Sequence, residues 1–169
     1  MSLQLQLATS SFLHKENSTL FLDYRTKRDH PIHSGKLSPP GGKLESIDFS
    51  PMDGAIREVL EETNIIARNL IYRGKVTFFN EKRAINGKLM NKNWEVHLYD
   101  CYFFNDRKAI AREGELYWAD NKIVPQLPLH EGDYVLWEWL SKFKEFEGEI
   151  EHVGEKLTRA ELKSSIVLK

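Results

Sequence analysis

The sequence predicts an α+β fold in which helices pack on a mixed β-sheet. Polar and apolar residues alternate with a period of two over residues 3–7, and several segments after residue 70 are also strand-like. Apolar residues recur at helical spacing over 50–63 and 133–146. Strands on both sides of a helix indicate a layered architecture. The length of 169 residues fits one domain, so we expect a single domain over 1–169.

The beginning of the chain is expected to form a hairpin followed by an irregular loop. Residues 3–7 and 19–25 are strand-like, and residues 15–18 supply the turn between them. Residues 34–42 hold three glycines and two prolines, a composition that interrupts regular structure. This loop precedes the clearest helix of the chain.

That helix is predicted to begin at Ser50 and to end at Glu62 or Thr63. Ser50 can cap it, Pro51 suits the first helical position, and Asp53 lies in the first turn. Further strands are predicted at 70–79, 88–98 and 100–104, with a hairpin turn at 85–88. The middle of the chain should therefore be mostly sheet.

A second helix is predicted over 133–146. Five apolar residues recur there at helical spacing: Val135, Leu136, Trp139, Leu140 and Phe143. Trp137, Trp139 and Phe146 belong to the same pattern, so we expect them to line the core or a groove rather than to stack on a nucleobase.

Composition favours a small-molecule partner. With 24 Lys+Arg against 25 Asp+Glu, the net charge of -1 predicts no general binding of nucleic acid. The sequence shows no secretory signal and no run near the roughly eighteen apolar residues of a membrane span, so we expect a cytoplasmic protein without a membrane partner. Cys101 is the single cysteine and is expected to pack inside a strand.

Three glutamates on the first helix predict a cation site. Glu58, Glu61 and Glu62 stand at i, i+3 and i+4, so their carboxylates share one patch of the helix. Such like charges repel one another, and binding a cation relieves the repulsion. Oxygen ligands of this kind suit hard ions such as Mg²⁺. The alternative is an ordinary solvated acidic face.

A pair of glycines upstream of the helix favours the cation site. Gly41 and Gly42 allow close approach of the backbone, and a carbonyl there can serve as a further oxygen ligand. Arg57 can reach Glu61 at i+4 and orient it. Glycines and spaced Arg-Glu and Glu-Glu pairs together rarely arise by chance.

The segment from Gly42 through Arg57-Glu58-Val59-Leu60-Glu61-Glu62 to Ile65 resembles the Nudix box. Two departures from the family pattern stand out. The spacer before Arg57 is one residue longer, with Asp48 in place of a glutamate, so a metal or structural role for Asp48 is left open. Asn64 replaces the final glycine, a mild change because asparagine also adopts the left-handed conformation that ends a helix.

The resemblance implies a divalent-ion site. Glu58, Glu61 and Glu62 would bind Mg²⁺, or alternatively Mn²⁺, with the Gly41 or Gly42 carbonyl as an added ligand. The glycine loop, including Lys43, would bind the diphosphate. The implied fold is the Nudix fold, a mixed β-sheet sandwiched between helices.

Further segments resemble the MutT-like branch, which contains 8-oxo-dGTP diphosphatases. They are residues 24–27, 33–37, 113–118 and 130–133. The resemblance implies a catalytic and metal-binding role for Glu113, with Glu115 as the rival position. It also implies that Asp133 reads the purine edge, the alternative being an ordinary helix N-cap. Arg25 is a candidate phosphate ligand.

We therefore expect a metal-dependent hydrolase that converts a nucleoside triphosphate to monophosphate and pyrophosphate. An oxidised purine such as 8-oxo-dGTP is the leading substrate. A nucleotide sugar or ADP-ribose is the alternative, because the box binds the diphosphate and not the group attached to it. A non-catalytic module that senses a nucleotide or binds a protein is the alternative of another class, and the three retained glutamates argue against it.

Overall fold

The computed structural model describes residues 5–81, 83–85, 88–90 and 92–169, and the side chains of 83–90 are left out of the description. Its helices are α1 (Pro51–Thr63), α2 (Glu131–Lys142) and the short 3-10 helix η1 (Val124–Gln126). The early strands are β1 (Leu5–Lys15), β2 (Ser18–Asp23), β3 (Leu37–Ser38), β4 (Gly41–Lys43), β5 (Ile66–Arg68) and β6 (Ile71–Glu81). The later strands are β7 (Arg83–Ile85), β8 (Lys88–Met90), β9 (Asn93–Cys101), β10 (Phe103–Asn105), β11 (Glu115–Asp120), β12 (Phe143–Val153) and β13 (Lys156–Val167).

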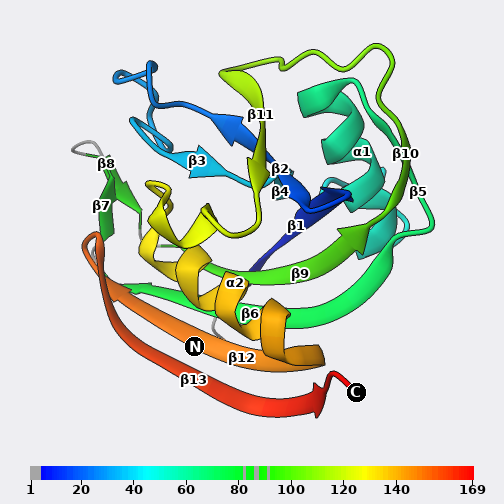
Figure 1. The fold of residues 1–169 in the computed structure, drawn as a ribbon. Coiled ribbons are helices and arrows are strands. Elements are labelled where there is room, and N and C mark those ends of the chain that lie inside the picture. The colour runs from blue at the N-terminus through cyan, green and yellow to red at the C-terminus, as the bar shows by residue number, and fades with distance from the viewer. Residues whose placement is uncertain (1–4, 82, 86–87, 91) are drawn as a thin grey trace.

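The main sheet is mixed, as predicted. Its strand order is β11-β2-β1-β9-β6-β12-β13, with β3 beside β2 and β4 beside β1. β1 runs parallel to β9 and β6 runs parallel to β12, while the other neighbours in that order are antiparallel. Figure 1 shows the long, curved strands β9, β6 and β12, with α2 lying across them.

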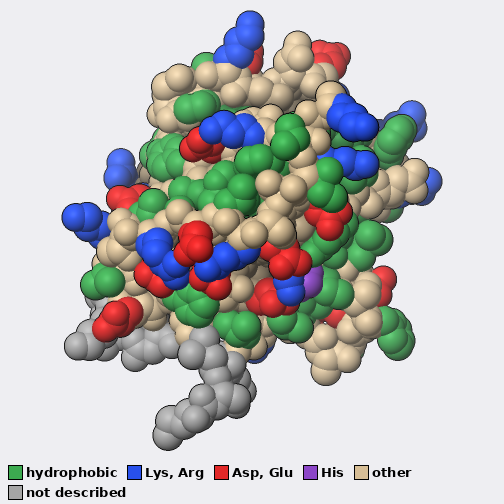
Figure 2. All heavy atoms as spheres, turned by 90° about the horizontal axis from the view of Figure 1, so that it is seen from below, with side chains coloured by type: hydrophobic (Ala, Val, Ile, Leu, Met, Phe, Trp, Pro, Cys, Tyr) green, Lys and Arg blue, Asp and Glu red, His purple; other side chains and the backbone are tan. Residues whose placement is uncertain are grey.

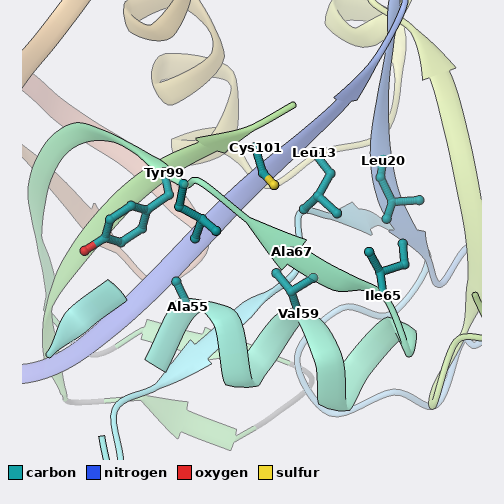
Figure 3. Packing of buried hydrophobic residues seen from close by; sticks show 9 residues of the cluster. Leu13, Leu20, Ala55, Val59, Ile65, Ala67, Tyr99 and Cys101 are labelled. Carbon is teal, nitrogen blue, oxygen red and sulfur yellow. The ribbon is translucent and has the colours of Figure 1, made fainter. Parts of the chain in front are cut away.

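The two helices cover opposite faces of this sheet. Adjacent residues of a strand point to opposite faces, and Leu13 belongs to the apolar cluster under α1 while Phe12 belongs to the cluster under α2. Figure 3 shows Ala55 and Val59 of α1 directed at the first cluster. Cys101 is buried there, which confirms its packing role, and burial raises the pKa of its thiol.

The first hairpin and the first helix confirm the sequence predictions. β1 and β2 pair across the turn at residues 16–17, although β1 continues well beyond residue 7 and residues 3–4 lie outside the described residues. In the middle of the chain, β7 and β8 pair with Ile85 opposite Lys88, and the turn residues 86–87 between them also lie outside the description. The predicted strand 88–98 is wrong as one unit, because β8 ends at Met90 and β9 begins at Asn93.

The second helix ends earlier than predicted. α2 ends at Lys142, and Phe143 is already extended at φ -121° and ψ 139°. The guanidinium of Arg73 on β6 donates to the carbonyls of Leu140 (2.8 Å) and Phe143 (2.6 Å). These bonds satisfy carbonyls at the helix end from outside the helix. Phe146 therefore lies in β12, where it is buried, rather than on α2.

The terminal hairpin of β12 and β13 extends the sheet at one edge. Arg159 on β13 pairs with Glu149 (3.2 Å) and Glu151 (2.6 Å) on β12. Figure 2 shows acidic and basic side chains gathered together in the view from below. No helix within the described ranges is both long and apolar enough to cross a bilayer.

Candidate active site

Helix α1 presents its glutamates on the side away from the apolar cluster. The Ser50 side chain accepts a hydrogen bond from the Asp53 N–H at 3.2 Å, and Asn64 ends the helix at φ 55°, as the sequence predicts. Ala55 and Val59 are fully buried against the sheet (Figure 3). Burial of that face leaves the other face, which carries the glutamates, toward the glycine loop.

Arg57 is the hub of the acidic patch. Its guanidinium donates to Asp48 through Nε (2.9 Å) and Nη2 (2.8 Å), and to the Lys43 carbonyl at 3.0 Å. Nη1 donates to Glu58 (2.9 Å) and to Glu61 (3.2 Å). The expected Arg57–Glu61 pair is therefore present, as one of several contacts that tie the loop to the helix.

Asp48 serves as the main partner of Arg57. Only 3% of its side chain is exposed, and its second oxygen also accepts the Glu45 N–H at 2.8 Å. Hydrogen bonds from Arg57 lower the pKa of Asp48 to about 2. Both oxygens of Asp48 therefore face Arg57 and the loop, which gives Asp48 a structural contact at the start of the acidic patch.

The glycine pair lies directly against two of the glutamates. The Gly41 N–H donates to Oε1 of Glu62 at 3.2 Å. A Cβ on residue 42 would lie 2.7 Å from Cδ of Glu58, closer than real Cβ contacts come. The Glu58 carboxylate thus occupies the space of a side chain at residue 42, and a larger residue there would have to displace it.

Glu62 is the most strongly perturbed carboxyl group of the patch. Burial raises its pKa to about 8, and the charges of Glu58, Glu113 and Glu61 also raise it. The hydrogen bond from the Gly41 N–H acts in the opposite direction and lowers the pKa. Burial also raises the pKa of Glu58. Desolvated carboxylates that repel one another are the arrangement that a cation stabilises.

A cavity of about 380 Å³ gathers several of the predicted site residues from distant segments. Its lining includes Gly41, Gly42, Glu62, Glu113 and Asp133. A neighbouring cavity of about 190 Å³ shares Asp133 with it and is walled by Phe78, Trp94 and Val96, with Asn80 and His152 beside them. The acidic patch therefore opens toward a largely apolar recess.

Residues 5–141 match the model of the NUDIX domain family. The chain belongs to the Nudix family. It is 28% identical over 139 residues to the "Uncharacterized Nudix hydrolase YvcI" of Bacillus subtilis (strain 168), an alignment that covers 82% of this chain and 80% of the relative. Its activity is that of a Nudix pyrophosphatase, which hydrolyses phosphoric anhydride bonds.

Solved structures share the Nudix fold at low sequence identity. A mutator MutT protein from Bacillus halodurans superimposes with a TM-score of 0.76 and 21% identity, covering 94% of this chain and 98% of the other. The NUDIX domain of Shewanella oneidensis NrtR, solved with ADP ribose, gives a TM-score of 0.61 and 18% identity, covering 82% and 87%. These likenesses confirm the predicted fold.

The structure separates the two rival acids beside the Nudix box. Glu113 precedes β11, lines the cavity with Glu62, and has its Oε2 3.0 Å from Nε2 of His30. Glu115 lies in β11 opposite Asp23, and the cavity lining does not include it among the described residues. Geometry therefore favours Glu113.

Asp133 is not the N-cap of α2. The N-cap is His130, and Asp133 stands in the first turn, with its own N–H donating to the His130 carbonyl at 2.9 Å. The N-cap alternative is therefore wrong. Asp133 lines both cavities, at the point where they meet.

Among the described residues, neither Arg25 nor Lys43 lines the cavity. Arg25 forms a bidentate pair with Asp23, with Nε 3.0 Å from Oδ1 and Nη2 2.6 Å from Oδ2, and its guanidinium lies 4.9 Å from the Tyr117 ring centroid. Lys43 is exposed and contributes its carbonyl to Arg57. A phosphate ligand role for Arg25 would require it to leave Asp23.

Several residues of the cavities carry no signal that identifies them in the sequence. Tyr24, His30 and His33 come from the loop after β2, whereas Phe78 and Trp94 come from the strands β6 and β9. Their approach depends on the pairing of strands far apart in the chain. His152 is the exception, because the period of two along β12 could have placed it on the buried face of a strand. The buried residues of this alternation are Phe146, Gly148, Ile150 and His152.

Glu62 is expected to make the metal-free Nudix domain less stable as the pH rises. The folded state retains its proton up to a pKa of about 8, whereas the unfolded chain releases it near the ordinary value of 4.5. The stabilisation is complete below that ordinary pKa and is lost as the pH rises through the folded pKa. In a chelating buffer, the Tm of the wild type should fall more steeply between pH 4.5 and about pH 8 than the Tm of Glu62→Gln. Equal slopes would contradict the perturbed pKa.

Proposed function

We propose that the protein is a divalent-metal-dependent pyrophosphohydrolase of a nucleoside triphosphate, with an oxidised purine such as 8-oxo-dGTP as the leading substrate. One observation carries the proposal: the cavity of Glu62 and Glu113 opens into the recess of Phe78 and Trp94, with Asp133 between them. Phosphates would face the acidic patch while the base enters the apolar recess.

The donor set fits a hard divalent ion. All the candidate ligands are carboxylate or carbonyl oxygens, which Mg²⁺ and Mn²⁺ accept. Within the described part of the chain, no three His, Cys, Asp or Glu side chains are already grouped as ligands of one ion. Arg57 holds Glu58 and Glu61 instead. We propose that Glu58, Glu61 and Glu62 bind the ion, together with a carbonyl of the glycine loop.

The reaction adds water across a phosphoric anhydride bond. A P–O bond to water forms, the bond to the pyrophosphate oxygen breaks, and the water proton is taken up by a base. When bound, the ion neutralises charge on the phosphates and lowers the pKa of water. Glu113, as an exposed carboxylate at the cavity, is suited to accept or position that proton. Gly41 and Gly42 keep the backbone close to the phosphates.

A substrate panel tests this proposal. It contains normal and oxidised nucleoside triphosphates, nucleotide sugars and ADP-ribose in Mg²⁺, with products separated by chromatography. We expect monophosphate and pyrophosphate, with the highest kcat/KM for an oxidised purine triphosphate. Preferred cleavage of ADP-ribose or a nucleotide sugar would replace the substrate assignment. Binding without hydrolysis across the panel would identify a non-catalytic module.

Asp133→Ala is expected to reduce the preference for purine over pyrimidine triphosphates by about 10- to 100-fold. A carboxylate can accept hydrogen bonds from the ring and amino N–H groups of a purine, and loss of a charged hydrogen bond has about this effect. The ratio of kcat/KM values measures it. Glu138→Ala is the matched control, because Glu138 lies exposed on the same helix and pairs with Lys142. An unchanged ratio in Asp133→Ala would exclude base reading by this residue.

A further inference from the structure

The contacts of His30 define which of its ring nitrogens carries the proton. The backbone N–H groups of Ile32 and His33 both donate to Nδ1, at 3.2 Å and 2.9 Å. A nitrogen that accepts hydrogen bonds has no proton of its own. The neutral ring therefore carries its proton on Nε2, and this nitrogen lies 3.0 Å from Oε2 of Glu113. His30 is thus a donor aimed at Glu113.

The His30 ring is held on several sides. Its centroid lies 4.5 Å from the Tyr24 ring and 5.2 Å from the His33 ring. The His30 side chain is 15% exposed, whereas that of Glu113 is 64% exposed. His30 is therefore the packed partner, and Glu113 is the exposed group whose side chain the hydrogen bond restrains.

We infer that His30 is a positioning residue that holds the Glu113 carboxylate at the cavity shared with Glu62. The inference rests on the proposed function, since it gives Glu113 a part in the reaction. An exposed glutamate samples many rotamers, and ordering its side chain has an entropic cost of about 1–2 kcal/mol. A rigid donor reduces that cost before substrate arrives. The bond uses Oε2, and the other oxygen, Oε1, would accept the proton of the reacting water.

His30 is suited to this role by its place in the fold. It lines the same cavity as Glu62 and Glu113, although 83 positions in the sequence separate it from Glu113. Gly114, next to Glu113, has a φ of +69°, and a Cβ there would lie 3.2 Å from the Tyr24 ring. Tyr24 thus packs against the His30 ring and lies beside Gly114, the neighbour of Glu113. The loop after β2 and the segment before β11 are joined at the catalytic cavity.

Two substitutions of His30 separate positioning from loop structure. In His30→Asn the amide oxygen can replace Nδ1 as the acceptor for the loop N–H groups, but the donor to Glu113 is lost. In His30→Gln the amide nitrogen can reach Glu113, but the loop acceptor is lost. We expect His30→Asn to lower kcat by about 10- to 100-fold with KM within about twofold. His30→Gln should recover most of that kcat.

If His30 acts through Glu113, substitutions of the two residues should not have independent effects on kcat. Glu113→Gln should lower kcat by a similar factor, and the double variant with His30→Asn should be no slower than the slower single variant. The inference would be overturned if His30→Asn kept the wild-type kcat, or if His30→Gln failed to recover it. Additive losses of kcat in the double variant would also overturn it. A wild-type kcat in Glu113→Gln would overturn it as well. The proposed function is tested separately, because it depends on turnover of the wild-type protein on the substrate panel.

A direct measurement does not depend on variants. The ¹⁵N NMR shifts of the His30 imidazole in the wild-type protein distinguish the two tautomers. We expect the Nε2–H form at a pH where the ring is neutral. The Nδ1–H form would overturn the inference even if every variant failed to fold.

Discussion

Glu62→Gln is expected to lower kcat by about 10²- to 10⁴-fold, because it removes a charged ligand of the proposed metal ion, and a bound ion contributes several kcal/mol to transition-state stabilisation. Glutamine keeps the shape of the side chain and an oxygen for the Gly41 N–H. It removes the negative charge from the most desolvated carboxyl group of the patch. Steady-state kinetics in saturating Mg²⁺, on the best substrate of the panel, measures the loss.

The matched control for this substitution is Glu115→Gln. Glu115 lies on β11, and the cavity lining of the described residues does not contain it. We expect its kcat to stay within about twofold of wild type, because surface substitutions of this kind have small effects. The unfolding Tm of both variants reports whether the fold is kept. A wild-type kcat in Glu62→Gln would show that the metal assignment is wrong.

The helix of the Nudix box could be predicted because its determinants are local. Ser50 caps it, Asn64 ends it in the left-handed conformation, and the glutamates follow from helical spacing. The same local reasoning predicted the Arg57–Glu61 contact. It could not find the stronger partner Asp48, which approaches Arg57 only because the longer loop folds back.

The end of α2 could not be predicted because a distant residue determines it. Phe143 and Phe146 continue the helical pattern, yet they also fit a strand of period two that runs to His152. The contacts of Arg73 favour the end of the helix at Lys142 and the start of the strand at Phe143. Arg73 takes the carbonyls at the end of the helix and forms a buried pair with Asp100 on β9.

The site was predictable only in its acidic half. Gly42, Glu58 and Glu62 lie close together in sequence and in space. The recess also needs β12, which pairs with the distant strand β6, so Phe78 and His152 give no local signal that they share a cavity. Glu113 and Asp133 were found through resemblance to a family, and the structure then places them on one cavity.

Gly74→Ala is expected to lower the free energy of unfolding by about 2–6 kcal/mol, because backbone strain and overpacking act together. Gly74 has a φ of +119°, and a Cβ there would lie 1.8 Å from the Phe146 carbonyl oxygen. The register between β6 and β9 shifts at this point, which makes Arg73 the extra residue of a bulge. Denaturant unfolding measures the change.

Gly154→Ala is the control that separates the two contributions to this loss. Gly154 also has a positive φ, of +64°, but nothing lies within 4 Å of a Cβ placed there. Strain alone is expected to destabilise this variant by about 1 kcal/mol. The excess loss in Gly74→Ala then reports the clash with β12. Equal losses would show that β12 can move away from β6, and in that case His152 could not be a fixed wall of the recess beside Phe78.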